Sequence, residues 1–225
     1  MYGRQSEDKF KAARERMLRY DLRGRDIADP RVLAAMADVP REEFIPPSHR
    51  SQAYSDGPLP IGNDQTISQP YIVALMTQEL RVNPECEVLE VGTGSGYQTA
   101  ILSKLAKKVY TIERFSDLAE SAKTVLDKLG ISNVEFYLGD GSNGWPAGRL
   151  PSSGCFDRII ITAGVPEISE PLVGQLADRG LIVAPVGGRT VQRLVACEKK
   201  TDKLISRTIC DVRFVRLIGE HGFQQ

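Results

Sequence analysis

A short apolar run that ends in three closely spaced glycines is the strongest chemical signal in the chain. The predicted strand Glu87–Val91 is followed by Gly92, Gly94 and Gly96, after which a helical pattern begins. Glycine lets the backbone approach a ligand where a Cβ would clash, and the first turn of the helix offers free N–H groups. The pattern therefore predicts a strand, turn and helix that bind a ligand.

Two acids follow the next two predicted strands and suit the same ligand. Glu113 lies 21 residues after Gly92, the separation at which a carboxylate accepts hydrogen bonds from ribose hydroxyls. Asp140 lies between Gly139 and Gly141, where it would face the ligand across the edge of the sheet. Gly-Asp-Gly alone is an ordinary turn, but after the other two motifs we expect Asp140 to contact the adenine of a nucleoside cofactor.

The glycine spacing distinguishes between cofactor classes. Proteins that bind NAD usually carry Gly-x-Gly-x-x-Gly, whereas Gly94 and Gly96 are two residues apart and Tyr97 follows. A nicotinamide dehydrogenase is therefore a weak alternative, and a P-loop is excluded because no Gly-Lys-Ser/Thr follows. The form Glu-x-Gly-x-Gly-x-Gly resembles class I methyltransferases, which bind S-adenosylmethionine. The expected cofactor site comprises Glu90, Gly92, Thr93, Gly94, Ser95, Gly96, Glu113, Arg114, Asp140 and Gly141.

A second set of motifs resembles one methyltransferase family. Residues 57–73 (GPLPIGNDQTISQPYIV) and 39–47 (VPREEFIPP) closely resemble segments of the protein-L-isoaspartate O-methyltransferases. Shorter matches extend the resemblance from about residue 26 to the C-terminus, at residues 88–100, 110–114, 139–146, 156–163, 166–168 and 184–187. The run Thr66-Ile-Ser-Gln-Pro70 is far more specific than the glycine turn.

The family resemblance implies a substrate and a reaction. Methyl transfer from S-adenosylmethionine to the α-carboxylate of L-isoaspartyl residues in damaged proteins and peptides gives an ester that cyclises to a succinimide, which hydrolyses partly to aspartate. The carboxylate is ionised near pH 7, so no general base is needed in a chain with only two histidines. By the resemblance Ser68 is the catalytic hydroxyl that fixes the carboxylate, although it could also cap a helix. The expected substrate-binding residues are Ile61, Gln65, Thr66, Ile67 and Ser68.

Some positions depart from the family pattern, and they keep two alternatives open. Asp64 stands where the family commonly has Gly, Arg216 stands where it has Pro, and the span from Trp145 to Phe156 is longer than usual. One alternative is a class I methyltransferase of a small molecule or of RNA, although the Asn/Asp-Pro-Pro-aromatic motif of base methylation is absent. The other alternative, which the departures motivate, is a protein that binds the cofactor without catalysis.

The order of the predicted elements indicates how these residues are positioned. Residues 1–50 have helical patterns, residues 51–70 are expected to be a loop, and strands alternate with helices from residue 87 onward. This alternation predicts an α/β fold with a doubly wound, mostly parallel sheet, and the resemblance makes it a Rossmann-like methyltransferase sheet of seven strands. We expect one domain over residues 1–225, with N-terminal helices and the substrate loop in 1–86 and the cofactor-binding sheet in 87–225. The expected strands are 87–91, 109–112, 134–138, 156–162, 180–186, 191–198 and 208–217, and the expected helices after residue 70 are 71–82, 98–107, 117–129 and 171–177.

Composition limits the partners. Twenty-nine basic and 29 acidic residues give a net charge of zero, which argues against a surface built to bind nucleic acid or anionic lipid. The four cysteines are scattered without a Cys-x-x-Cys pair, so we expect neither a metal site nor a disulfide framework. The N-terminus is too charged for a signal peptide. These features predict a cytoplasmic protein with no metal, nucleic-acid or membrane partner. The family resemblance implies that it acts on isoaspartyl proteins and peptides, and we expect a monomer.

Overall fold

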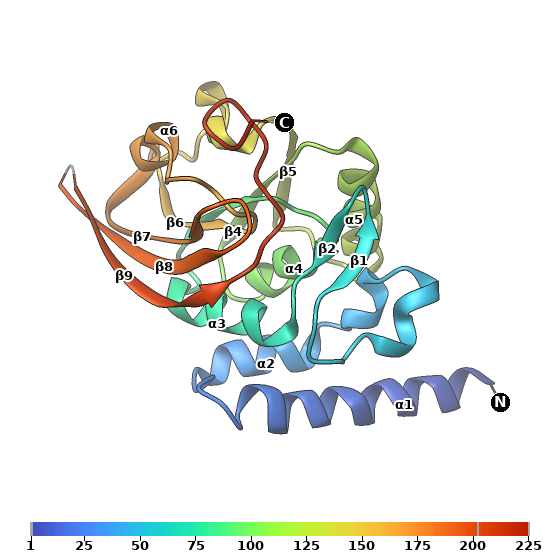
Figure 1. The fold of residues 1–225 in the computed structure, drawn as a ribbon. Coiled ribbons are helices and arrows are strands. Elements are labelled where there is room, and N and C mark those ends of the chain that lie inside the picture. Colours follow the sequence, from blue (N-terminus) through green and yellow to red (C-terminus); the bar gives the residue numbers. More distant parts are fainter. Residues whose placement is uncertain (1, 202, 225) are drawn as a thin grey trace.

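The fold is built around a sheet of seven strands in the order β5-β4-β3-β6-β7-β8-β9 (Figure 1). It is described by a computed structural model that covers residues 2–201 and 203–224. The first five strands in this order pair in parallel, whereas β8 and β9 are antiparallel to their neighbours, which confirms the predicted α/β class. The strands are β3 (Glu87–Val91), β4 (Lys108–Glu113), β5 (Val134–Leu138), β6 (Phe156–Ile161), β7 (Leu176–Gly187), β8 (Gln192–Lys200) and β9 (Lys203–Val212).

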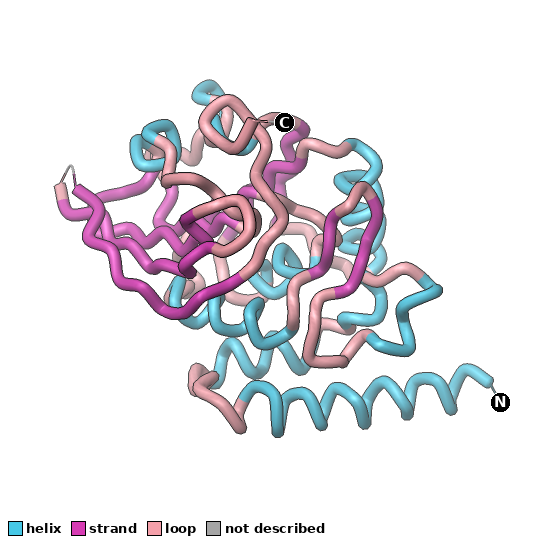
Figure 2. The backbone as a smooth tube through the Cα atoms, viewed as in Figure 1, coloured by secondary structure: helices cyan, strands magenta, loops and turns pink. Residues whose placement is uncertain are grey.

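Helices and short helical turns cover the sheet (Figure 2). Successive residues of the central strands face opposite sides, as the pleat requires. Val88 packs into a core that it shares with the N-terminal helices, whereas Leu89 packs into a second core with Trp145 and α6. The helices are α1 (Tyr2–Arg16), α2 (Pro30–Asp38), α3 (Pro70–Leu80), α4 (Tyr97–Ser103), α5 (Ser116–Lys128) and α6 (Glu170–Gly174), and the turns are η1 (Met17–Leu22), η2 (Arg41–Phe44), η3 (Pro47–Gln52), η4 (Gly141–Asn143) and η5 (Ala147–Arg149).

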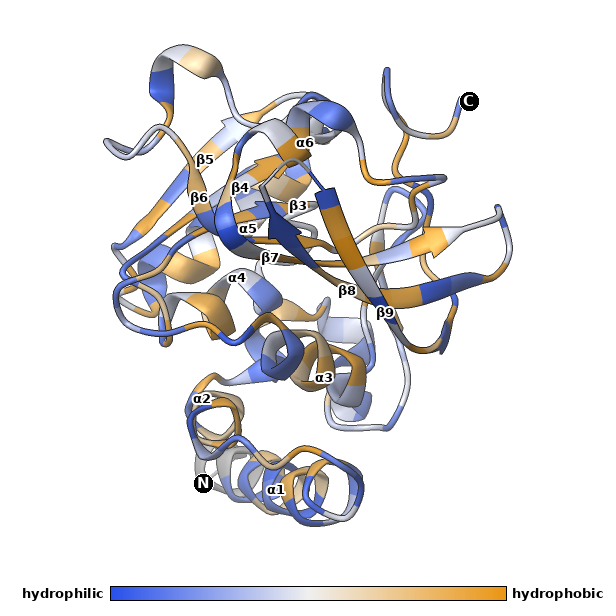
Figure 3. Cartoon of the chain, turned by 90° about the vertical axis from the view of Figure 1, so that its left-hand side faces the viewer, coloured by the Kyte–Doolittle hydropathy of each residue, from blue (hydrophilic) through white to orange (hydrophobic). Residues whose placement is uncertain are grey.

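The N-terminal helices form a layer against α3, which in turn contacts β6 and β7 (Figure 3). Helix α2 has a capped start: the Asp29 side chain accepts a hydrogen bond from the Arg31 N–H, and Pro30 occupies the first helical position. Met17, Leu22 and Met36 are fully buried in the core beneath this layer. The N-terminal segment is thereby joined to the sheet by apolar packing.

The segment predicted as a loop, residues 51–70, contains a β-hairpin instead. Strands β1 (Leu59–Gly62) and β2 (Gln65–Ile67) pair antiparallel. Asn63 and Asp64 form the turn with φ angles of 49° and 55°, the left-handed conformation at both positions that two-residue hairpin turns require. Strands of four and three residues are too short for a readable alternation, so only the turn residues carried a signal.

Several predicted element boundaries need correction. Helix α5 begins at Ser116 rather than 117, and the Asp117 carboxylate in its first turn accepts hydrogen bonds from the Asn63 side chain. The last strand is β9 rather than 208–217, because residues after Val212 leave the sheet and run toward the ends of β3 and β6. Helix α4 ends at Ser103 rather than 107, and α6 at Gly174 rather than 177.

The described residues carry no helix both long and apolar enough to cross a membrane. Nor do residues 2–201 and 203–224 contain a group of three or more His, Cys, Asp or Glu side chains placed to hold a metal ion. The four cysteines are free thiols.

Candidate active site

The glycine turn lies at the carboxyl ends of β3 and β6, where open α/β sheets bind ligands. Gly92 has a φ of +99°, and a Cβ at this position would lie 2.4 Å from the Thr162 Oγ1. The Thr162 hydroxyl in turn lies 2.5 Å from the Gly92 carbonyl oxygen and 2.9 Å from that of Val91. The end of β6 thus holds the turn so closely that only glycine fits at position 92.

Glu113 is fixed beside this turn by three backbone amides. The Gly94 N–H donates to Oε2 at 2.9 Å, and the N–H groups of Arg114 and Phe115 donate to Oε1 at 2.8 and 3.0 Å. Oε1 thus accepts two donors, whereas Oε2 accepts one and retains capacity for a further donor. The geometry therefore presents an oriented acceptor at the end of β4, as the predicted contact with ribose hydroxyls requires.

Two connected cavities form what we call the inner cleft. The first, of about 70 Å³, lies between the glycine turn and the hairpin strand β2, and the second, of about 110 Å³, lies between the ends of β4 and β5 and residues 216–218. They share Gln65, Gly92, Glu113 and Ala163. A wider cavity of about 550 Å³, the outer pocket, adjoins the first through Thr66, Ser68, Thr162, Phe214 and Val215.

Most of the residues predicted from the sequence are brought together at the inner cleft. Among the described residues, four of the predicted site residues do not line it: Ile61, Glu90, Gly96 and Asp140. Ile61 nevertheless lies close to the turn, since its Cδ1 is 3.5 Å from the position of a Cβ on Gly94. Gly96 is the residue from which α4 begins. The predicted residues that line the cleft are Gln65, Thr66, Ile67, Ser68, Gly92, Thr93, Gly94, Ser95, Glu113, Arg114 and Gly141.

Glu90 lies beneath the turn rather than in the cleft. Its side chain is fully buried, and Oε2 accepts hydrogen bonds from the hydroxyls of Thr99 at 2.5 Å and Thr111 at 2.7 Å. Oε1 has no hydrogen-bond partner among the described residues. Burial raises the pKa of Glu90 to about 8, despite the two hydroxyl donors. The residue therefore ties β3 to α4 and β4, and its predicted contact with the cofactor remains a prediction.

Asp140 anchors the C-terminal segment. Oδ1 accepts from the N–H and hydroxyl of Ser142 at 2.9 and 2.7 Å, and Oδ2 accepts from the Glu220 N–H at 2.7 Å. Burial opposes ionisation, but these donors outweigh it and hold the pKa of Asp140 below its ordinary value. The turn that it caps, η4, closes with the Gly144 N–H donating to the Gly141 carbonyl oxygen at 3.1 Å. The predicted contact of Asp140 with adenine remains a prediction.

Ser68 lies between β2 and α3, at the boundary of the inner cleft and the outer pocket. The interpretation of Ser68 as a helix cap is wrong, because α3 starts at Pro70 with Gln69 as its N-cap residue. Within residues 2–201 and 203–224, the Ser68 hydroxyl makes no hydrogen bond to another side chain or to the backbone. Ser68 thus lines two cavities, and no described residue engages its hydroxyl.

Three residues that the sequence did not single out line both the inner cleft and the outer pocket: Thr162, Phe214 and Val215. Thr162 had a usable signal, because it directly follows β6 at the carboxyl edge of the sheet. Phe214 and Val215 had none, since they reach the cleft only through long-range contacts. The Phe214 N–H donates to the Gln192 side chain at 2.9 Å, and the Val215 carbonyl accepts from the Gly164 N–H at 2.7 Å.

Two positions that depart from the family pattern differ in their distance from the site. Asp64 is exposed in the hairpin turn and lines none of the cavities formed by the described residues. Arg216 is also exposed but borders the second cavity of the inner cleft. Asp64 therefore adds no charge to the cleft lining, whereas Arg216 places a cation beside it.

Comparisons with known proteins agree with this arrangement. The family model "Protein-L-isoaspartate(D-aspartate) O-methyltransferase" matches residues 12–222. The chain is 54% identical over 211 residues to the protein-L-isoaspartate O-methyltransferase of Methanoregula boonei, covering 94% of this chain and 95% of that protein. It is 50% identical over 216 residues to that of Trichlorobacter lovleyi, covering 96% and 97%.

Solved structures show the same relationship. A protein-L-isoaspartate O-methyltransferase superposes with a TM-score of 0.79 at 29% identity, over 93% of this chain and 67% of that chain. A putative protein-L-isoaspartate O-methyltransferase from Plasmodium falciparum, in complex with S-adenosyl-L-homocysteine, has a TM-score of 0.75 at 26% identity, over 92% and 97%. The family match spans the hairpin, the glycine turn and Glu113 alike, and the chain belongs to the protein-L-isoaspartate(D-aspartate) O-methyltransferase family.

Proposed function

We propose that Ser68 and the β2 segment hold an isoaspartyl carboxylate at the boundary of the inner cleft and the outer pocket, while S-adenosylmethionine binds in the inner cleft. As a member of its family, the chain methylates isoaspartyl residues in proteins and peptides. The observation that carries the residue assignments is the position of Ser68, which lines both cavities with a hydroxyl that no described residue engages.

The chemistry of the inner cleft fits the cofactor. Gly92 and Gly94 leave backbone exposed where side chains would obstruct a ligand, and Glu113 offers an oriented carboxylate oxygen, Oε2, to a ribose hydroxyl. The complex of the Plasmodium falciparum relative with S-adenosyl-L-homocysteine supports the same assignment. When bound, S-adenosylmethionine supplies an electrophilic methyl group on a sulfonium. The glycine turn and Glu113 would hold and orient the cofactor.

The outer pocket suits a polypeptide substrate. It is several times larger than either cavity of the inner cleft, and it is bordered by Pro58, Ile72 and residues 211–215. A carboxylate entering from this side meets Thr66, Ser68 and Thr162 at the boundary. We infer that the damaged segment occupies the outer pocket and presents only its carboxylate to the inner cleft.

The reaction needs positioning more than proton transfer. The attacking carboxylate is already ionised near pH 7, so the site has to hold its oxygen in line with the methyl group and exclude water. Confining the two reactants at near contact can account for most of the rate. The Ser68 hydroxyl would orient one carboxylate oxygen by donating a hydrogen bond, leaving the other oxygen to attack.

Substitution of Ser68 tests the proposal. Loss of a hydrogen bond to a charged substrate group costs about 1.5–3 kcal/mol, so Ser68→Ala should lower kcat/KM for an isoaspartyl peptide by about 10- to 100-fold. The affinity for S-adenosylhomocysteine, measured by calorimetry, should be unchanged. Ser103→Ala is the matched control, because its hydroxyl donates to the Ala100 carbonyl oxygen away from both cavities. Wild-type protein that forms no base-labile methyl ester above a normal-aspartyl control would contradict the proposal.

We also infer that the protein is a cytoplasmic monomer with neither a nucleic-acid nor a membrane partner. The net charge of zero supports the absence of nucleic-acid and membrane partners, because neither an RNA nor an anionic bilayer would be attracted by the molecule as a whole. Light scattering coupled to size-exclusion chromatography tests the oligomeric state, and a mass near twice 24.8 kDa would contradict it.

A further inference from the structure

Arg41 is a fully buried arginine in the segment 39–47, which no part of the proposed reaction uses. Its Nε donates to the Ala53 carbonyl oxygen at 2.8 Å, and its Nη2 donates to the Ser68 carbonyl oxygen at 2.7 Å. No acidic side chain forms a salt bridge with it among the described residues. Its hydrogen bonds are therefore made to backbone positions and not to a counter-ion.

The two carbonyl oxygens bracket the hairpin. Ala53 precedes β1 and Ser68 follows β2, so a single guanidinium ties together the two ends of the segment that forms one wall of the inner cleft. The planar fork of arginine can make two such bonds in fixed directions, whereas the ammonium of lysine is a point charge on a flexible stem. The contact therefore fixes the positions of the two ends of the hairpin segment, and with them the position of Ser68.

The same guanidinium lies against the opposite wall of the cleft. Its Cζ is 4.8 Å from the centre of the Tyr97 ring, and Tyr97 is the first residue of α4, directly after the glycine turn. Tyr97 is buried, packs edge-on against Phe44 and lines the inner cleft. Arg41 thus links the start of the cofactor-side helix to the backbone of Ser68.

Burying the charged guanidinium of Arg41 costs free energy. Burial lowers the pKa of Arg41 to about 10, although the Tyr97 and Tyr54 rings oppose the decrease, and the group stays charged at neutral pH. Its Nη1 has no hydrogen-bond partner among the described residues. A buried charge that leaves a donor unpaired contributes little to net stability, so its contribution has to be sought in what it positions.

On these grounds we propose that Arg41 is a positioning residue for methyl transfer: it sets the distance between Ser68 and the cofactor turn by holding both ends of the hairpin against Tyr97. The inference rests on the proposed role of Ser68 and extends it to the VPREEFIPP segment. Displacement of a reacting group by about 1 Å can lower a rate by about 100-fold. Loss of the fork should therefore impair the chemical step more than the binding of the cofactor.

Arg41→Lys tests the proposal, because it keeps the charge and removes the fork. We expect kcat for an isoaspartyl peptide to fall by about tenfold or more, while the Kd for S-adenosylhomocysteine changes by less than about threefold. Amide hydrogen exchange in residues 59–67 should become faster. In the Ser68→Ala background the same substitution should cost much less activity, since residues that act together are not additive.

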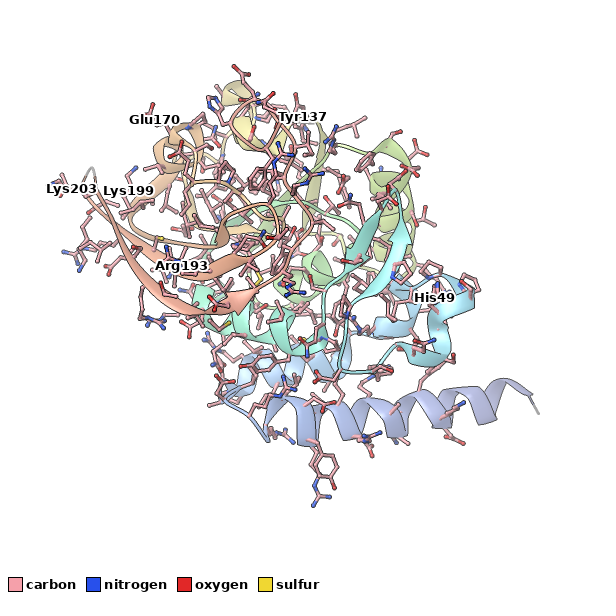
Figure 4. All side chains as sticks on the ribbon, viewed as in Figure 1. His49, Tyr137, Glu170, Arg193, Lys199 and Lys203 are labelled. Carbon is pink, nitrogen blue, oxygen red and sulfur yellow. The ribbon has the colours of Figure 1, made fainter. Side chains whose placement is uncertain are left out.

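Two controls separate positioning from stability. Tyr54→Phe removes a hydroxyl of the same cluster, which accepts from the Arg41 backbone N–H and the Arg14 Nε–H and donates to the Glu42 carboxylate, and it leaves both bonds of the fork intact. Lys199→Met removes a cation that donates to the carbonyl oxygens of Val173 and Leu176, at the far ends of β8 and β9 from the hairpin (Figure 4). Both variants should lower the melting temperature and retain kcat.

The outcomes are distinct. The proposal would be overturned by an Arg41→Lys protein that has a lower melting temperature than the wild type but the same kcat and the same amide hydrogen-exchange rates in residues 59–67. Should this variant not fold, Arg41→Gln, which removes the buried charge and its desolvation cost, is assayed in the same way, and failure of both to fold would make Arg41 a structural residue only. If the wild-type protein does not methylate the peptide, the proposed function fails, whereas the hydrogen-exchange comparison still decides whether Arg41 holds the hairpin.

Discussion

At the scale of single residues, Glu90 has an unusual place, because an acid of the glycine motif is buried and forms no salt bridge among the described residues. Its pKa of about 8 results from burial, and its two hydroxyl donors only partly compensate. The ordinary value of a glutamate is 4.5, so the folded state keeps a proton that the unfolded chain releases between these two pH values. The free energy of unfolding should therefore fall as the pH rises through this window.

Glu90→Gln should remove this dependence on pH. The amide can still accept from the Thr99 and Thr111 hydroxyls, but it does not titrate. As the pH rises from 5 to 8, the melting temperature of the variant should increase relative to that of the wild type. The difference should grow by at least about 3 °C, because a change of one kcal/mol in the free energy of unfolding shifts the melting temperature by about that much in a chain of this size. Differential scanning fluorimetry across the range measures it, and parallel curves for the two proteins would count against a neutral Glu90.

At the scale of elements, the hairpin β1–β2 is held over the inner cleft at its tip as well as at its base. The Asn63 side chain donates to both oxygens of Asp117 in the first turn of α5, at 2.9 and 2.8 Å. Both side chains are exposed, so the contact adds little stability. It does hold the tip of the hairpin, whose strand β2 supplies Gln65, Thr66 and Ile67 to the lining of the cleft.

Asn63→Ala should therefore act on exchange of the cofactor and not on folding. With the tip released, we expect S-adenosylhomocysteine to dissociate about three- to tenfold faster, with a change in unfolding free energy within about 0.5 kcal/mol. Stopped-flow displacement measures the rate. Lys128→Ala is the matched control, since it breaks an exposed ion pair between α5 and Glu43 that does not involve the hairpin. An unchanged dissociation rate for Asn63→Ala would argue against a role of the tip.

Sequence patterns predicted those elements whose signal is local. The three glycines, the run before them and the spacing to Glu113 placed the turn at the ends of β3 and β4 correctly, because strand, turn and helix follow one another in the chain. The hairpin was missed because its strands are short. Phe214 and Arg41 were given no role because their positions depend on contacts with Gln192 and Ser68, 22 and 27 residues away.

At the scale of the whole molecule, the N-terminal helices and the sheet share one apolar core. Leu22 is fully buried in the cluster that also contains Val88 and Val183 of the central strands. Trp145, the only tryptophan, is buried in the second cluster on the other face of the sheet. The single-domain organisation remains a proposal, which this shared packing supports.

Leu22→Ala tests whether the chain unfolds as a single domain. Removing a buried leucine side chain costs about 2–5 kcal/mol. If residues 1–86 and 87–225 unfold together, the variant should shift the urea midpoint reported by Trp145 fluorescence as much as the midpoint reported by circular dichroism. A variant in which only the circular dichroism transition moves would show that the two parts unfold separately.

The turn η4 ends in a dipeptide that can itself form isoaspartate, the kind of damage on which the enzyme acts. Asn143 precedes Gly144, and isoaspartate arises when the nitrogen of the following residue attacks an asparagine side chain, a ring closure that glycine hinders least because it has no side chain. Here the Gly144 N–H is committed to the Gly141 carbonyl oxygen, and Gly144 is buried. The folded enzyme therefore shields from ageing a dipeptide that could make it a substrate of another copy of itself, and that protection lasts only as long as η4 stays closed.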